Sequence, residues 1–156
     1  MKLLRVGEHG KEIPAIIDSQ NNFRNLSKII KDFTPENLNF EILDKIKQLN
    51  LNSLPLINNN QRIGSCVIKP ANFIAIGLNY KAHAEETNSD APTEPIVFNK
   101  SPNCITGPND NIVIPKNSKS LDHEVEIALV IGSKAKYIKE DEAQDYVLGY
   151  CICNDI

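Results

Sequence analysis

The segment 124–132, Glu-Val-Glu-Ile-Ala-Leu-Val-Ile-Gly, constrains the fold more than any other part of the chain. Its run of apolar, largely β-branched residues predicts a strand that ends at the glycine. Because side chains alternate across a strand, Glu124 and Glu126 point to the same face. Two neighbouring carboxylates repel each other, and a divalent cation would relieve that repulsion. Two exposed acids at a solvated strand end are the alternative interpretation.

A third carboxylate ends the last predicted strand, Gly149-Tyr-Cys-Ile-Cys-Asn-Asp. On a neighbouring strand, Asp155 would complete an oxygen ligand set with Glu124 and Glu126, which suits Mg²⁺, Mn²⁺ or Ca²⁺ rather than zinc or copper. An ordinary acid in a loop after a strand is the alternative for Asp155. For all four cysteines, Cys66, Cys104, Cys151 and Cys153, we expect buried apolar thiols, since a zinc site at Cys151 and Cys153 would need two more soft ligands at short spacing.

Two further clusters carry candidate catalytic residues. Gly77-Leu-Asn-Tyr-Lys-Ala-His-Ala-Glu-Glu follows a predicted buried strand and has helical spacing, which places His83 and Glu86 on one face. A histidine beside a carboxylate can act as a general base, whereas an exposed helix with an ordinary histidine is the alternative. Lys100, at the end of the predicted strand 95–100, could meet an anionic substrate, although lysine is also common on surfaces.

Composition narrows the function classes. The 156 residues carry a net charge of -3 with a pI near 5.6, so we expect no nucleic-acid partner, which would require a basic face. The N-terminus lacks the apolar run of a signal peptide, and no stretch approaches the roughly 18 apolar residues of a membrane span. We therefore expect a cytoplasmic protein with no membrane partner.

The chain divides into two differently patterned regions. Residues 1–68 are rich in asparagine and weakly amphipathic, and they predict a small supporting domain. Residues 69–156 alternate β segments with Gly, Pro and Asn. The predicted class is α+β, mostly β. The expected strands are 2–6, 13–18, 73–77, 95–100, 111–115, 124–132 and 149–155, and the expected helices are 28–33 after Ser27, one starting at Thr34 with a face at Leu43, Ile46 and Leu49, and 140–148.

Read in order, the chemical clusters resemble the fumarylacetoacetate hydrolase family. The matching segments are 77–86, Phe-Asn-Lys-Ser-Pro at 98–102, Gly-Pro-Asn-Asp-Asn-Ile-Val-Ile-Pro at 107–115, Leu-Asp-His-Glu-Val-Glu-Ile-Ala-Leu-Val-Ile-Gly at 121–132, and 142–155. The resemblance implies a mixed β-roll catalytic domain over residues 69–156, preceded by a small N-terminal cap domain over residues 1–68. It implies that Glu124, Glu126 and Asp155 bind Mg²⁺ or Mn²⁺, with Ca²⁺ as a further option.

The resemblance also implies a chemistry. His83 and Glu86 would activate water or move protons, and Lys100 would be a third catalytic residue. Family members act on oxo-acids and enols, such as acylpyruvates, oxaloacetate, fumarylacetoacetate-like or hydroxy-dienedioate substrates, through an enolate whose charge the metal spreads. Dimers are common in the family, so a homodimer is expected for a full-length chain.

The sequence departs from the family pattern at Ile156, where family members continue with further strands. We therefore expect an incomplete catalytic domain. A catalytically inactive subunit or fragment that pairs with another chain is the alternative function.

Overall fold

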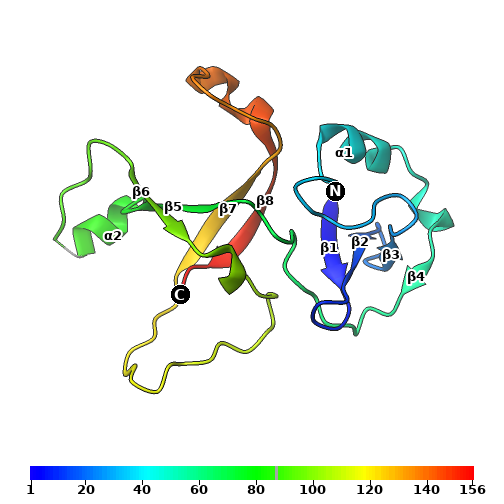
Figure 1. Ribbon diagram of the computed structural model, residues 1–156, viewed down its shortest axis with the longest axis horizontal. Coiled ribbons are helices and arrows are strands. Elements are labelled where there is room, and N and C mark those ends of the chain that lie inside the picture. The colour runs from blue at the N-terminus through cyan, green and yellow to red at the C-terminus, as the bar shows by residue number, and fades with distance from the viewer. Residues whose placement is uncertain (87) are drawn as a thin grey trace. The chain divides into compact units, whose positions relative to one another are not determined.

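The computed structural model describes residues 1–86 and 88–156, in which antiparallel strands dominate and helices are short (Figure 1). Residues 1–68 and 106–156 form one compact unit, and residues 69–105 form a second. Neighbouring strands in each sheet of the described residues run antiparallel. The mostly β class expected from the sequence is confirmed.

The N-terminal region contains a four-stranded sheet in the order β1-β2-β3-β4. Its members are β1 (Lys2–Val6), β2 (Ile13–Ile17), β3 (Phe23–Asn25) and β4 (Leu56–Ile57). The first two strands match the prediction closely, and the turn between them includes Gly10, whose φ of 78° favours glycine. The two short strands were not predicted, because two or three residues are too few to show an alternating pattern.

The helix expected at 28–33 is wrong, because the chain forms a single turn there. The backbone amides of Ile29 and Ile30 both donate to the carbonyl of Leu26. The expected N-cap was Ser27, but the side chain that accepts a backbone hydrogen bond here is that of Asn25, from the Ser27 amide at 2.7 Å. An α-helix needs successive i to i−4 hydrogen bonds, so this single turn does not make residues 28–33 a helix.

The second expected helix exists but begins later than Thr34. Thr34 starts a turn, and its carbonyl accepts from the amides of Asn37 and Leu38. Helix α1 (Phe40–Lys47) begins after Asn39, whose side chain accepts from the Ile42 amide at 2.9 Å as an N-cap. The predicted face is confirmed at Leu43 and Ile46, which are buried.

Two apolar clusters form the core of the N-terminal region. The first contains Leu4, Val6, Ala15, Phe23 and Ile57, and the second contains Ile16, Leu26, Ile30, Phe33 and Ile46. Alternation along β2 explains the division, since Ala15 belongs to one cluster and Ile16 to the other. All the buried members of both clusters come from residues 1–68.

A chain of ion pairs crosses the same region. The buried guanidinium of Arg5 donates to both carboxylate oxygens of Asp32, at 2.6 and 3.0 Å, and contacts Glu12 at 3.3 Å. Arg62 then joins Glu12 to Asp110, at 2.6 and 2.5 Å. These hydrogen bonds hold the segment that begins at residue 106 against the N-terminal region.

The unit of residues 69–105 is a β-hairpin with two short helical segments. Strand β5 (Phe73–Gly77) pairs with β6 (Ile96–Lys100), α2 (Lys81–Glu86) lies in their connection, and the 3₁₀ turn η2 (Pro102–Cys104) follows. Both strands were predicted within one residue of their observed bounds.

The C-terminal part is a long two-stranded ribbon of β7 (Val125–Ile131) and β8 (Val147–Asn154), which lie side by side in Figure 1. The connection contains the 3₁₀ segment η3 (Glu140–Tyr146) where a longer helix was expected. β7 ends at Ile131, and the next residue is Gly132, where a Cβ atom would overlap the Leu148 side chain. The strand predicted at 111–115 is wrong: those residues join no sheet within the described part of the chain.

The helices of the described residues are short compared with a membrane span. None of them is long and apolar enough to cross a bilayer.

Candidate functional site

The backbone pairing of β7 with β8 brings two of the predicted metal ligands together. The amide of Asp155 donates to the carbonyl of Glu124 at 2.8 Å. The amide of Glu124 donates in turn to the side-chain oxygen of Asn154 at 2.7 Å. Glu124 and Asp155 are therefore cross-strand neighbours at the end of the ribbon, as expected of strands that pair there.

The register places the third predicted ligand on the same face. Glu126 lies opposite Cys153, one pair further along the ribbon than Glu124 and Asp155. Directly opposed residues of an antiparallel pair share a face, and residues two apart on one strand share it as well. All three carboxylate residues consequently occupy one end of one face, where Glu126 and Asp155 are half-buried and Glu124 is exposed.

The donor set fits a hard divalent cation. Three carboxylates supply only oxygen ligands and more negative charge than one face tolerates without a counter-charge. Within residues 1–86 and 88–156, no three His, Cys, Asp or Glu side chains converge closely enough to form a ready ligand set. The backbone pairing therefore gives the three residues a shared face but not a formed ligand set, and their assignment as ligands stays a prediction.

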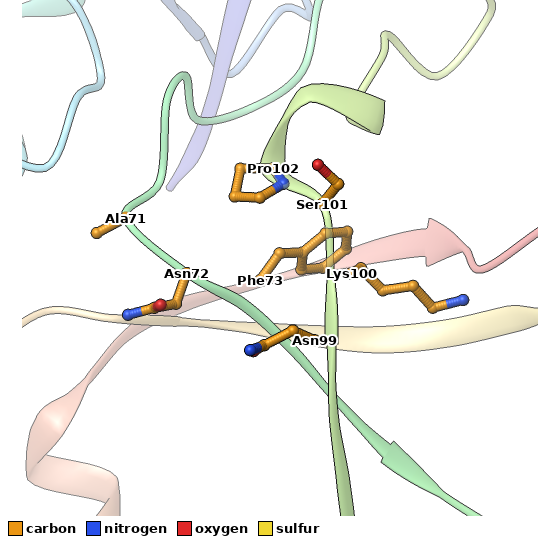
Figure 2. A pocket seen from close by; sticks show the side chains of 7 residues that line it. All are labelled: Ala71, Asn72, Phe73, Asn99, Lys100, Ser101 and Pro102. Carbon is orange, nitrogen blue, oxygen red and sulfur yellow. The ribbon is translucent and has the colours of Figure 1, made fainter.

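Lys100 lies in a pocket of about 360 Å³ within the unit of residues 69–105. The pocket is formed where β5 begins and β6 ends, and Asn72, Phe73, Asn99, Ser101 and Pro102 are among its lining residues. Figure 2 shows the Asn72 and Lys100 side chains extending in opposite directions on either side of the Phe73 ring. The ammonium group of Lys100 also lies 5.6 Å from the centre of the Phe98 ring.

The role predicted for Lys100 stays a prediction. An ammonium group beside an aromatic ring can donate hydrogen bonds to an anion while the ring covers the apolar part of the ligand. The sequence singled out Lys100 within the segment 98–102, which also contains Asn99, but not Asn72 or Phe73. The polar-to-apolar change from Asn72 to Phe73 at the start of the strand 73–77 was the available signal.

His83 and Glu86 lie on α2, the short helix of the same unit, and both are exposed. Their spacing of three residues puts them on one helical face, as predicted. The helix is held by Ala84, which is buried and whose amide donates to the carbonyl of Tyr80 at 3.1 Å. The catalytic roles predicted for His83 and Glu86 stay predictions.

The cysteines differ from the expectation of buried apolar thiols. Cys104 is exposed, and Cys66, Cys151 and Cys153 are half-buried. The physical reason for the last two is that they occupy the same partly covered face of β8 as Asp155.

Comparison with other proteins places the chain among known sequences. A protein of Burkholderia orbicola, provisionally named a hydrolase, is 46% identical over all 156 residues. A protein of Burkholderia ambifaria with the same kind of name is 44% identical over the same length. The chain covers 55% of each relative, so it spans about half the length of these curated relatives.

Solved structures show the same fold over nearly the whole chain. A protein of Mycobacterium abscessus, provisionally named a 2-hydroxyhepta-2,4-diene-1,7-dioate isomerase, matches with a TM-score of 0.71 and 30% identity, over 99% of this chain and 52% of its own. The HpcE-named protein of Mycobacterium smegmatis matches with a TM-score of 0.76 and 26% identity, over 99% of this chain and 55% of its own.

A family profile gives the same result for the C-terminal half. Residues 72–156, which include every predicted site residue, match the profile described as Fumarylacetoacetate (FAA) hydrolase C-terminal. That match covers more than half of the chain and coincides with the region that carries the ordered motifs. The chain belongs to the fumarylacetoacetate hydrolase family.

Proposed function

We propose that this chain carries the metal-binding and substrate-binding parts of a divalent-metal-dependent enzyme that acts on a small oxo-acid or enol. The observation that carries the proposal is the β7–β8 register, which puts Glu124, Glu126 and Asp155 on one face. Family membership supports it, because enzymes of this family generally use a divalent metal. The isomerase name of one structural relative supports an enol-forming substrate class.

The backbone fixes two of the three carboxylate residues relative to each other. Glu124 and Asp155 are fixed relative to each other by the 2.8 Å backbone hydrogen bond, and Asn154 adds a second constraint at the Glu124 amide. Mg²⁺ is our proposed ion, with Mn²⁺ as a substitute, because both prefer oxygen ligands. When bound, such a cation stabilises negative charge that develops on substrate oxygens.

The remaining residues would bind substrate and move protons. Lys100, in its pocket beside Phe73, would hold the carboxylate of the substrate. His83 would accept or donate the proton at the reacting carbon, and Glu86 would orient its ring from the same face of α2. In these roles Lys100 determines binding, whereas His83 determines turnover.

Metal binding to the 156-residue chain tests the proposal directly. We would titrate Mg²⁺ and Mn²⁺ into the chain by isothermal calorimetry, with and without oxalate as a mimic of an oxo-carboxylate. We expect oxalate to strengthen metal binding, and we expect Glu126→Gln to weaken it by more than about tenfold, since even residues behind the ligands change metal affinity by that factor.

The matched control is Glu140→Gln, which removes an exposed carboxylate from η3 on the connection between the strands. It should leave both titrations unchanged. Equal metal binding by Glu126→Gln and the unsubstituted chain would overturn the assignment of the ligands.

A second candidate function is a catalytically inactive subunit that pairs with another chain. The outer face of the ribbon favours it: Ile127 and Ile152 face each other across the strands and are 65% and 79% exposed. An inactive subunit would show no metal-linked binding of oxalate. Sedimentation velocity would show whether the chain self-associates, and Ile127→Lys should weaken that association if this face is the contact.

A further inference from the structure

Cys66 is held in place by the backbone on both sides. The Gly64 amide donates to the carbonyl of Arg5 at 2.8 Å, and the Ile68 amide donates to the carbonyl of Phe33 at 3.0 Å. Ile63 also pairs with Val6 at the end of β1. Backbone hydrogen bonds on both sides of Cys66 therefore fix its position relative to the N-terminal region.

Cys151, on strand β8 of the ribbon, lines the same cavity as Cys66. It lies on β8 opposite Ala128, whose small side chain leaves room beside it, and on the partly covered face of the ribbon. Cys66 and Cys151 both line a cavity of about 150 Å³, together with Val67, Val130 and Leu148. Both residues are half-buried rather than fully enclosed.

The two thiols line the same cavity, and each shifts the pKa of the other. A hydrogen bond from Cys151, aided by backbone amides and by the positive charge of Arg5, lowers the pKa of Cys66 to about 7 despite its burial. The same hydrogen bond, together with burial, raises the pKa of Cys151. A pair with one thiolate and one protonated thiol in contact has the division of roles that disulfide formation requires.

We propose that Cys66 and Cys151 form a reversible, oxidant-sensitive thiol pair that a hydroperoxide converts to a disulfide. The Cys66 thiolate attacks the peroxide; its S–O bond forms as the O–O bond breaks, and hydroxide or alkoxide leaves and takes up a proton. The Cys151 sulfur then attacks the Cys66 sulfenic acid, so that the S–S bond forms, the S–O bond breaks and water leaves with the thiol proton. The two thiols supply the two electrons that reduce the peroxide.

The disulfide would connect the N-terminal region to β8, four residues before Asp155. It would be reversed by a dithiol through exchange, with the disulfide reduced and the dithiol oxidised. This pair is separate from the proposed metal and substrate residues, so it adds an oxidant response to the chain whatever the outcome of the metal titration.

Peptide mapping after peroxide treatment tests the proposal. The folded 156-residue chain would be treated with hydrogen peroxide, alkylated without reductant and digested. We expect a 66–151 cross-linked peptide that dithiothreitol removes, in the unsubstituted chain and in the control Cys104→Ser, which changes an exposed cysteine of η2. In Cys151→Ala, a dimedone adduct on Cys66 should replace the cross-link.

Three results would overturn the proposal. These are a cross-link between Cys151 and Cys153 in place of 66–151, oxidation confined to Cys104, and oxidation of Cys66 no faster than that of Cys104. Mapping of the unsubstituted chain distinguishes these outcomes by itself, so the proposal stands or falls even if Cys151→Ala does not fold.

Discussion

The N-terminal sheet and the β7–β8 ribbon are built from similarly apolar strands but bury them to different extents. In the sheet, Val6 and Ala15 are fully buried and sit within closed clusters. In the ribbon, the bulky residues Val125, Ile127, Leu129 and Ile131 all point to the exposed face, while Glu126, Ala128 and Val130 point to the half-covered one. The N-terminal region therefore has a buried hydrophobic core, whereas one face of the ribbon consists of exposed apolar side chains.

The largest difference between the two regions should appear on truncation of an apolar side chain. Phe33→Ala removes a ring that is 1% exposed in the second core cluster, and we expect it to lower the free energy of unfolding by about 3–5 kcal/mol. Urea unfolding followed by circular dichroism would measure it.

The control is Ile127→Ala on the exposed face of β7, which we expect to change the unfolding free energy by less than about 0.5 kcal/mol. A large effect of Ile127→Ala would mean that this face is already covered in solution, and the contrast between the regions would fail.

Ion pairs sharpen the same comparison. Arg5→Met leaves the carboxylates of Asp32 and Glu12 without their buried guanidinium, and we expect a loss of about 3 kcal/mol in the same unfolding assay. Lys45→Met breaks a pair with Glu41 that is exposed on both sides, so no measurable change is expected. Equal effects of the two substitutions would contradict a stabilising role for the buried network.

Acid should weaken the N-terminal region through Asp18. Burial alone would raise its pKa, but hydrogen bonds from Arg24, from the Asn22 amide and side chain and from the Gln20 amide lower it to about 2, below its ordinary value of 3.8. The carboxylate therefore adds stability above pH 3.8, and this stability is lost as the pH falls from there toward 2.

Unfolding free energies measured between pH 5 and pH 2 would test this contribution. Asp18→Asn cannot lose a charge in that window, so its stability should fall less steeply than that of the unsubstituted chain. Parallel curves would show that Asp18 contributes nothing to the acid dependence.

The smallest expected effect is on thiol reactivity where the ribbon meets the N-terminal region. Alkylation of Cys66 by iodoacetamide should increase with pH around a midpoint of about 7, because the thiolate is the nucleophile. Cys151→Ala removes the main cause of the low pKa and should move that midpoint upward, as peptide-resolved mass spectrometry would show. An unchanged midpoint would mean that the two sulfur atoms do not interact.

Long alternating or apolar segments were predictable from the sequence. The strands at 2–6, 73–77 and 124–132 were found within about a residue, because each pattern extends over five or more positions. The shared face of Glu124 and Glu126 followed from the same alternation.

Features that depend on partners distant in sequence were not predictable. Thr34 and Asn39 are both good helix caps, and only the turn at 34–38 decides that the helix begins after the second. The segment 111–115 has the composition of a strand but joins no sheet in the described chain. Cys66 and Cys151 line the same cavity although they are far apart in sequence, so no local pattern could reveal their proximity.

Because of the β7–β8 register, the proposed metal site depends on the number of residues in each strand as well as on which residues they are. The pairing shifts once, between Val130 and Ile131, and then runs without interruption to Asn154. An insertion in the loop at 133–139 lies outside that paired stretch and leaves Asp155 opposite Glu124. A one-residue deletion within 148–153 would turn Asp155 to the other face, because side chains alternate. The ligand set therefore tolerates changes of length in the loop but not in the strand.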